Sequence, residues 1–156
     1  MESEHTDNAG VAFHPPVLIL FFIGVGFVGR WLMSAEFLPR AWAVAAGFPV
    51  VVISLVLFGW AVITMHREGA SIPTGEPTDA IVANGPYRLS RNPIYLSMVI
   101  LLLGIGLWAN SGWFIVLAVL AIAFLTWGVI VREERYLGRK FGDSYYTYKK
   151  QVRRWL

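Results

Sequence analysis

The sequence predicts an all-α integral membrane protein with about four transmembrane helices. Hydrophobic residues make up 56% of the 156 residues and charged residues 15%. An average soluble domain has roughly 45–50% hydrophobic residues and about 25% charged residues. The hydrophobic residues are gathered in runs that almost exclude charge, which is typical of helices that face lipid. The runs cover residues 17–33, 41–65, 93–109 and 113–131.

The first two runs are predicted to be separate membrane helices. The first contains one charge, Arg30, whose long side chain can reach the headgroups from the end of the helix. The second spans roughly 37 Å at about 1.5 Å per residue, enough for a hydrocarbon core of about 30 Å. Residues 1–14 lack the basic start of a signal peptide, so the first run is expected to be a retained helix. Because residues 1–14 are polar, they are expected to form a tail ahead of one membrane domain at residues 15–156. Close helix packing in the first run is expected at three glycines: Gly24, Gly26 and Gly29.

One long polar segment, residues 66–92, separates the second run from the third. Its prolines and glycines argue against a continuous helix, and a connection of this length is either functional or disordered. The apolar patch at residues 80–83 and Tyr87 favour a packed loop. The third run is expected to begin with Asn92 as its N-cap and Pro93 as its first helical residue.

The last two runs are predicted to form a helical hairpin, because the uncharged turn at residues 110–112 is short. The fourth helix is expected to continue into the tail at residues 132–156, as far as Phe141, and to stop at Gly142. Asp143 is then expected to cap a final helix. The large side chains of this helix recur at helical spacing, which predicts an interfacial amphipathic helix: Tyr145, Tyr148, Val152 and Trp155.

The distribution of charge predicts how the chain is oriented. The long loop has three arginines and the tail has eight basic residues, which gives eleven on one side of the membrane against two on the other. Because loops rich in Lys and Arg stay in the cytoplasm, both termini, the loop and the tail are predicted to be cytoplasmic. Basic residues next to a membrane helix contact anionic lipid headgroups, which argues against nucleic acid as a partner.

The composition also excludes several kinds of chemistry. The chain has no cysteine, so it has no disulfide, no thiol nucleophile and no cysteine-based zinc site. Its three histidines, His5, His14 and His66, are scattered and show no metal-ligand spacing. The sequence therefore predicts no metal site, and it gives no sign of an obligate protein partner.

Three polar clusters are expected to meet on the cytoplasmic side: residues 84–88, 91–95 and 132–135. Taken singly, the three clusters are typical of a turn, the beginning of a helix and the end of a membrane helix, respectively. Taken together they indicate a site, because two carboxylates directly after an apolar helix, in a tail dominated by cations, are suited to a cationic ligand.

The blocks NGPYRLSRNPIY and EERYLGRKFGDSYYTYKKQV, separated by the hairpin, resemble the isoprenylcysteine carboxyl methyltransferase and phospholipid methyltransferase superfamily. The resemblance runs from about Ile72 to Trp155. It implies that the cofactor is S-adenosylmethionine, bound on the cytosolic side. It implies these cofactor-binding residues: Asn84, Gly85, Pro86, Tyr87, Asn92, Tyr95, Glu133 and Glu134. The candidate catalytic residues are Arg91, Asn92 and Glu134.

The chemistry of these residues agrees with that cofactor. The glutamates suit its ammonium and sulfonium groups, Arg88 or Arg91 can pair with its carboxylate, and Tyr87 or Tyr95 can stack on its adenine or face its sulfonium. Asn92 stands where the superfamily often has histidine. Asparagine can keep a hydrogen bond but cannot take a proton near neutral pH. A carboxylate acceptor needs no base, whereas an amine acceptor must lose a proton.

The leading hypothesis is S-adenosylmethionine-dependent methylation of a lipid-like or isoprenylated acceptor that enters from the bilayer. An isoprenylcysteine, a phospholipid amine, an isoprenoid acid and a small hydrophobic molecule all remain open. A second hypothesis is an NADPH-dependent membrane reductase of the sterol-reductase type, against which Tyr87 and the pair of glutamates argue. A third, motivated by Asn92, is a non-catalytic membrane module on the same scaffold.

Overall fold

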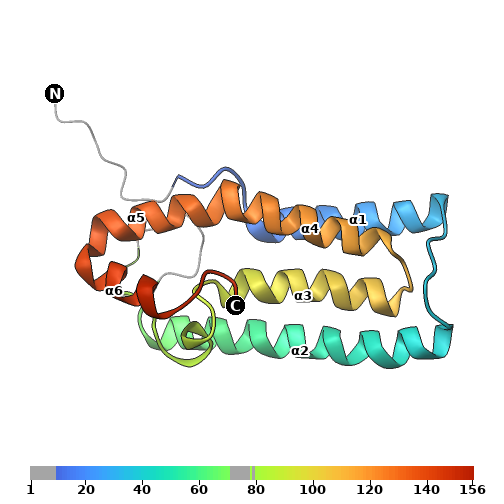
Figure 1. Cartoon of the computed structure of the whole chain (residues 1–156), viewed down its shortest axis with the longest axis horizontal. Helices are drawn as coiled ribbons and strands as arrows, with labels where there is room; N and C mark the ends of the chain where they lie inside the picture. The colour runs from blue at the N-terminus through green and yellow to red at the C-terminus, as the bar shows by residue number, and fades with distance from the viewer. Residues whose placement is uncertain (1–9, 71–77, 79) are drawn as a thin grey trace.

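The computed structural model describes residues 10–70, 78 and 80–156 of the chain. These residues form helices and, within these ranges, no strand (Figure 1). The elements in chain order are α1 (Pro15–Leu32), α2 (Arg40–Arg67), the 3₁₀ helix η1 (Gly85–Arg88), α3 (Pro93–Trp108), α4 (Trp113–Leu125), the π-helical turn η2 (Thr126–Ile130), α5 (Val131–Phe141) and α6 (Asp143–Gln151). The prediction of an all-α protein is confirmed.

The long helices lie side by side, and Figure 1 shows α3 running between α2 and α4. Within the described residues, three helices are long and apolar enough to cross a membrane: α1, α2 and the continuous helix Trp113–Phe141 made by α4, η2 and α5. The apolar helix α3 has 16 residues and is shorter than this. The prediction of four spans therefore stays a prediction, whereas the hairpin of α3 and α4 is confirmed.

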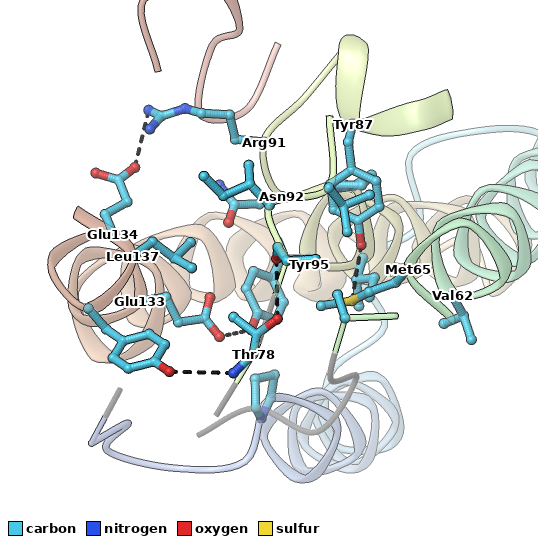
Figure 2. A pocket seen from close by; sticks show the side chains of 18 of the residues that line it. Val62, Met65, Thr78, Tyr87, Arg91, Asn92, Tyr95, Glu133, Glu134 and Leu137 are labelled. Atoms are coloured by element: carbon cyan, nitrogen blue, oxygen red, sulfur yellow. Dashed lines mark hydrogen bonds and ion pairs between the residues drawn. The ribbon is translucent and has the colours of Figure 1, made fainter. Parts of the chain in front are cut away.

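The two ends of the bundle differ. At one end the link from α1 to α2 lies beside the turn from α3 to α4. At the other end η1, α5 and α6 gather with the C-terminus, and side chains from several elements face one another (Figures 1 and 2). Residues 1–9 of the predicted tail, and 71–77 and 79 of the predicted loop, lie outside the described residues.

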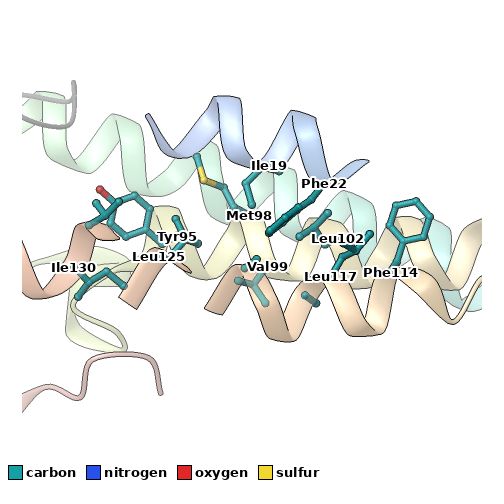
Figure 3. Packing of buried hydrophobic residues seen from close by; sticks show 13 residues of the cluster. Ile19, Phe22, Tyr95, Met98, Val99, Leu102, Phe114, Leu117, Leu125 and Ile130 are labelled. Atoms are coloured by element: carbon teal, nitrogen blue, oxygen red, sulfur yellow. The ribbon is translucent and has the colours of Figure 1, made fainter. Parts of the chain in front are cut away.

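The hydrophobic core lies between α1, α3 and α4, where Phe22, Leu102 and Phe114 are buried together (Figure 3). Many other large apolar side chains face outward, such as Leu20 at 68% exposure and Val119 at 62%. Exposed patches of this extent are unfavourable in water. They are expected where the surrounding solvent is lipid.

Glycines allow the closest helix contacts. A Cβ atom on Gly26 would lie 2.6 Å from the ring of Phe114, and one on Gly29 would lie 3.0 Å from that of Trp113. The prediction of close packing is confirmed at these two glycines but is wrong at Gly24, where no described atom lies within 4 Å. Periodicity alone did not separate the buried face of α1 from its lipid face.

The tail follows the prediction as far as Gly142. The fourth helix continues to Phe141, and Gly142 ends it with φ at +52°, a backbone conformation that favours glycine. The predicted cap by Asp143 is wrong, because Gly142 occupies the N-cap position and Asp143 is already helical.

The final helix is shorter than predicted. α6 ends at Gln151, so Val152 and Trp155 follow it and do not extend its apolar face. Tyr145 and Tyr148 are only 2% and 8% exposed and pack inside the protein. The prediction of an interfacial amphipathic helix is therefore not confirmed.

Candidate functional site

The long loop and the C-terminal tail meet at one end of the bundle. The hydroxyl of Tyr148 donates a hydrogen bond to the backbone oxygen of Tyr87 at 2.7 Å. Burial raises the pKa of the Tyr148 phenol well above its ordinary value, so the hydroxyl stays protonated and can donate even in alkaline solution. The backbone amide of Arg91 donates to the backbone oxygen of Arg153 at 3.0 Å. The prediction that the loop and the tail meet is thus confirmed, whereas their forming one functional site stays a prediction.

Asn92 joins the same contact. Its side-chain amide donates to the backbone oxygen of Arg154 at 2.9 Å. Asn92 occupies the N-cap position and Pro93 is the first residue of α3, as predicted, but the side chain of Asn92 makes no capping hydrogen bond. Capping would need the side-chain oxygen, whereas the bond from the side-chain nitrogen to Arg154 directs the amide group toward the C-terminal segment. The backbone oxygen of Asn92 still accepts from the amide of Leu96.

A cavity of about 510 Å³ lies at this end (Figure 2). Its size falls within the roughly 300–1,000 Å³ that is usual for small-molecule sites. Polar side chains line one part of it: Arg91, Asn92, Glu133, Glu134 and Tyr145. Apolar side chains from α1, α2 and α3 line another part: Val17, Phe58, Val62, Ile94 and Met98. The cavity can therefore hold a ligand with both a charged and a hydrophobic portion.

Glu134 is surrounded by cations. One of its oxygens lies 3.1 Å from Arg91 Nη2, and its two oxygens accept from Arg154 Nε and Nη2 at 2.8 and 2.9 Å in a forked pair. Lys149 Nζ donates to it at 3.2 Å. The Glu134 side chain is 9% exposed and that of Arg91 is 8% exposed. Glu134 thus connects α5 to the segment before α3, to α6 and to the C-terminal segment.

Glu133, its neighbour, has a different environment. Tyr95 donates to it from the phenol oxygen at 2.7 Å. No lysine or arginine of the described residues lies within ion-pair distance of it, although it lines the same cavity. A carboxylate placed in a cavity without a cation is suited to a positively charged ligand.

The side chain of Arg91 also has a hydrogen-bond donor that no described residue uses. Its two terminal nitrogens contact Glu134 and the hydroxyl of Tyr145, at 3.1 and 3.3 Å. Its Nε is buried and has no hydrogen-bond partner among the described residues. A buried donor without a partner is rare and costly in a native protein.

The first predicted cluster is placed differently. Asn84, Gly85 and Pro86 do not line the cavity, although Tyr87 does. The side chain of Asn84 donates to Glu68 at 3.0 Å. Gly85 has φ at +55°, and a Cβ there would lie 2.9 Å from the hydroxyl of Thr64, so this glycine lets the loop approach α2. A direct role of these three residues in cofactor binding stays a prediction.

Sequence reasoning missed several residues of the site. The beginning of α1 contributes His14 and Val17, and α2 contributes Phe58 and Val62. The apolar ones carry no signal that separates them from other lipid-facing residues. Arg154 was also missed as the forked partner of Glu134. The cluster of cations at the C-terminus was a signal that could have found it.

Comparison with known proteins identifies the class to which this fold and site belong. A model of the phospholipid methyltransferase family matches residues 42–144, more than half of the chain. The chain therefore belongs to the phospholipid methyltransferase family, within the superfamily of integral membrane methyltransferases. The predicted resemblance is confirmed.

Two individual relatives are similar to parts of the chain. A protein of Haemophilus influenzae, called an uncharacterized protein, is 41% identical over 63 residues, which are 40% of this chain and 100% of that protein. The cobalt-zinc-cadmium resistance protein CzcN of Cupriavidus metallidurans is 32% identical over 96 residues, which are 60% of this chain and 44% of that protein. The chain thus spans less than half of the length of CzcN. No solved structure matches this chain.

Proposed function

We propose that this protein transfers a methyl group from S-adenosylmethionine to a lipid-like acceptor. Family membership supports methyl transfer over the alternative of NADPH-dependent reduction. The transfer takes place at the membrane face that carries the loop and the tail, which the charge distribution predicts to be cytoplasmic. The observation that carries the proposal is a cavity in which Arg91, and Glu133 without a cationic partner among the described residues, adjoin an apolar lining.

The residues present fit the cofactor, whose sulfonium supplies a reactive methyl group. Arg91 lines the cavity, and its guanidinium group suits a carboxylate. Glu133 has no cationic partner among the described residues, which suits an ammonium or a sulfonium. Tyr87 and Tyr95 line the same cavity with aromatic rings, which can face an adenine or a cation.

The apolar part of the cavity suits the hydrocarbon portion of an acceptor. Val17, Phe58 and Met98 come from three different helices, so this part lies within the bundle of apolar helices. A lipid-like acceptor enters it from the bilayer and brings its polar end toward Asn92 and Glu133. Isoprenylated and phospholipid acceptors both join a hydrocarbon portion to a polar end.

The protein contributes mainly by positioning. Asn92 is held by the backbone oxygen of Arg154, and Glu133 is held by Tyr95, so both are fixed before a ligand arrives. Holding the two reactants in line removes much of the entropic barrier to transfer. The apolar lining excludes water from the reacting groups.

Calorimetric titration of S-adenosylhomocysteine into the detergent-purified protein tests the proposal. We expect saturable binding in the micromolar range, weakened about tenfold or more in Arg91→Gln, because a buried charge-assisted hydrogen bond is lost. The matched control is Arg88→Gln, which removes an exposed arginine that does not line the cavity and is expected to bind as the unaltered protein does. A folded protein without saturable binding would contradict the proposal.

A further inference from the structure

A second concave surface lies on α5, separate from the cavity described above. The backbone of Gly10 and five side chains from η2, α5 and α6 line it: Trp127, Arg132, Arg135, Arg139 and Tyr146. None of these residues lines the cavity at the candidate active site. We call this surface the arginine groove.

The arginines of the groove are concentrated on one helix face and have no carboxylate partner among the described residues. Arg132, Arg135 and Arg139 are spaced by three and four residues, which puts them on one face of α5. All three are exposed. No carboxylate of the described residues lies within ion-pair distance of them, whereas the arginines at the active site converge on Glu134. Like charges this close repel one another, so an anion placed between them is strongly attracted.

One of the guanidinium groups is held in place by the protein. Arg132 Nη1 donates to the backbone oxygen of Gly10 at 2.7 Å. The segment that carries Gly10 is itself fixed to the π-helical turn, because the amide of Ala12 donates to the oxygen of Gly128 at 3.1 Å. The groove is thus partly organised before a ligand arrives, which reduces the entropy lost on binding.

The groove lies at the boundary between apolar and charged parts of the longest helix. Trp127 belongs to the apolar part and is 72% exposed, and Tyr146 of α6 is 51% exposed. Exposed tryptophan and tyrosine are enriched at the level of lipid headgroups. The first arginine of the groove follows Trp127 by five residues. The groove therefore combines the cations of α5 with an apolar surface at Trp127.

We propose that the arginine groove binds the headgroup of an anionic membrane phospholipid. The guanidinium groups hold the phosphate through forked hydrogen bonds, a geometry that arginine matches better than lysine. The glycerol and the upper part of an acyl chain lie against Trp127. A free phosphate is also an anion but leaves the exposed tryptophan without a contact, so the lipid is the better match. This site is independent of the proposed methyl transfer.

Titration of a short-chain lipid into the full-length protein in a non-ionic detergent tests the proposal. The probes are dioctanoyl-phosphatidylglycerol, the zwitterionic dioctanoyl-phosphatidylcholine and inorganic phosphate, and binding is followed by calorimetry. We expect saturable binding of phosphatidylglycerol, and binding of the other two at least tenfold weaker. The double variant Arg135→Gln/Arg139→Gln is expected to bind phosphatidylglycerol about tenfold or more weakly, because it loses two of the three cations.

The matched control is Arg67→Gln/Arg153→Gln, which removes the same two residues from exposed positions outside the groove and is expected to bind as the unaltered protein does. Equal loss in both variants would overturn the proposal, because attraction would then follow net charge alone. Phosphate binding as tight as that of phosphatidylglycerol would overturn the lipid assignment. Arg135→Lys/Arg139→Lys keeps the charge, and affinity retained only in part would support the forked geometry. Circular dichroism checks that each variant is folded.

Discussion

The two ends of the helix bundle use buried polar groups in opposite ways. At the end far from the cavity, Asn110 in the turn from α3 to α4 is 4% exposed. Its side-chain oxygen accepts from the amides of Phe37 and Leu38, at 3.2 and 3.1 Å, and its side-chain nitrogen donates to the oxygen of Leu38 at 2.6 Å. Its backbone oxygen accepts from Arg30. Asn110 thus ties the link between α1 and α2 to the hairpin.

At the other end, polar groups are buried without being fully used. Arg91 Nε has no partner and Glu133 has no cation, within the described part of the chain. The far end also has one buried polar atom without a partner, the hydroxyl of Ser111. That hydroxyl is neutral, however, and Ser111 does not line the cavity. The difference suggests that the far end holds the bundle together, whereas the other end is arranged for a ligand.

The largest effect is expected from Glu134→Ala. It leaves the buried Arg91 without its carboxylate and removes the forked pair with Arg154. Breaking a buried ion pair in this way costs roughly 3–5 kcal/mol, and we expect a large fall in the thermal midpoint in detergent, with loss of cofactor binding. Lys149→Ala, which removes the exposed partner of Glu134, is the control and should cost less than about 1 kcal/mol. Equal effects of the two would show that the network is a surface feature.

The next largest effect is expected from Asn110→Ala. It removes three side-chain hydrogen bonds and puts alanine at a φ of +51°. A loss of about 2–3 kcal/mol of stability follows from the buried amides and oxygen left unpaired. Affinity for S-adenosylhomocysteine, measured well below the thermal midpoint, should remain within about twofold. A large loss of affinity would contradict the separation of the two ends.

The sequence predicted the helices well and the site in part. Long apolar runs predicted the positions of the apolar helices. The charge distribution predicted that the loop and the tail lie on one side of the membrane, and in the structure the two segments contact each other. Glu133 and Glu134 were predicted only as a pair. Neighbouring residues on a helix point about 100° apart, so their different partners depend on tertiary contacts that no local pattern contains. Arg154 reaches Glu134 because α6 ends early, at Gln151.

Packing at the far end gives the third prediction. In α2, a Cβ on Gly47 would collide with the backbone of Trp108 in α3, whereas one on Gly59 would meet no described atom within 4 Å. We expect Gly47→Ala to cost about 1–3 kcal/mol through overpacking. Gly59→Ala should be neutral or add up to about 1 kcal/mol, because alanine favours the helix. Comparison of the two thermal midpoints in detergent measures the difference, and an equal response would exclude a tight contact of α2 with α3.

The smallest effect on stability, and the sharpest on function, is expected from Glu133→Gln. Glutamine keeps an oxygen to accept from Tyr95, and no cation of the described residues loses a partner. Stability should therefore change by less than about 1 kcal/mol. Removing the charge should still weaken S-adenosylhomocysteine binding about tenfold, since the ammonium loses its carboxylate. Glu134→Ala is expected to lower both stability and affinity. If Glu133→Gln lowers the affinity but not the stability, Glu133 serves the ligand and Glu134 serves the fold. Unchanged affinity would place the ammonium elsewhere in the cavity.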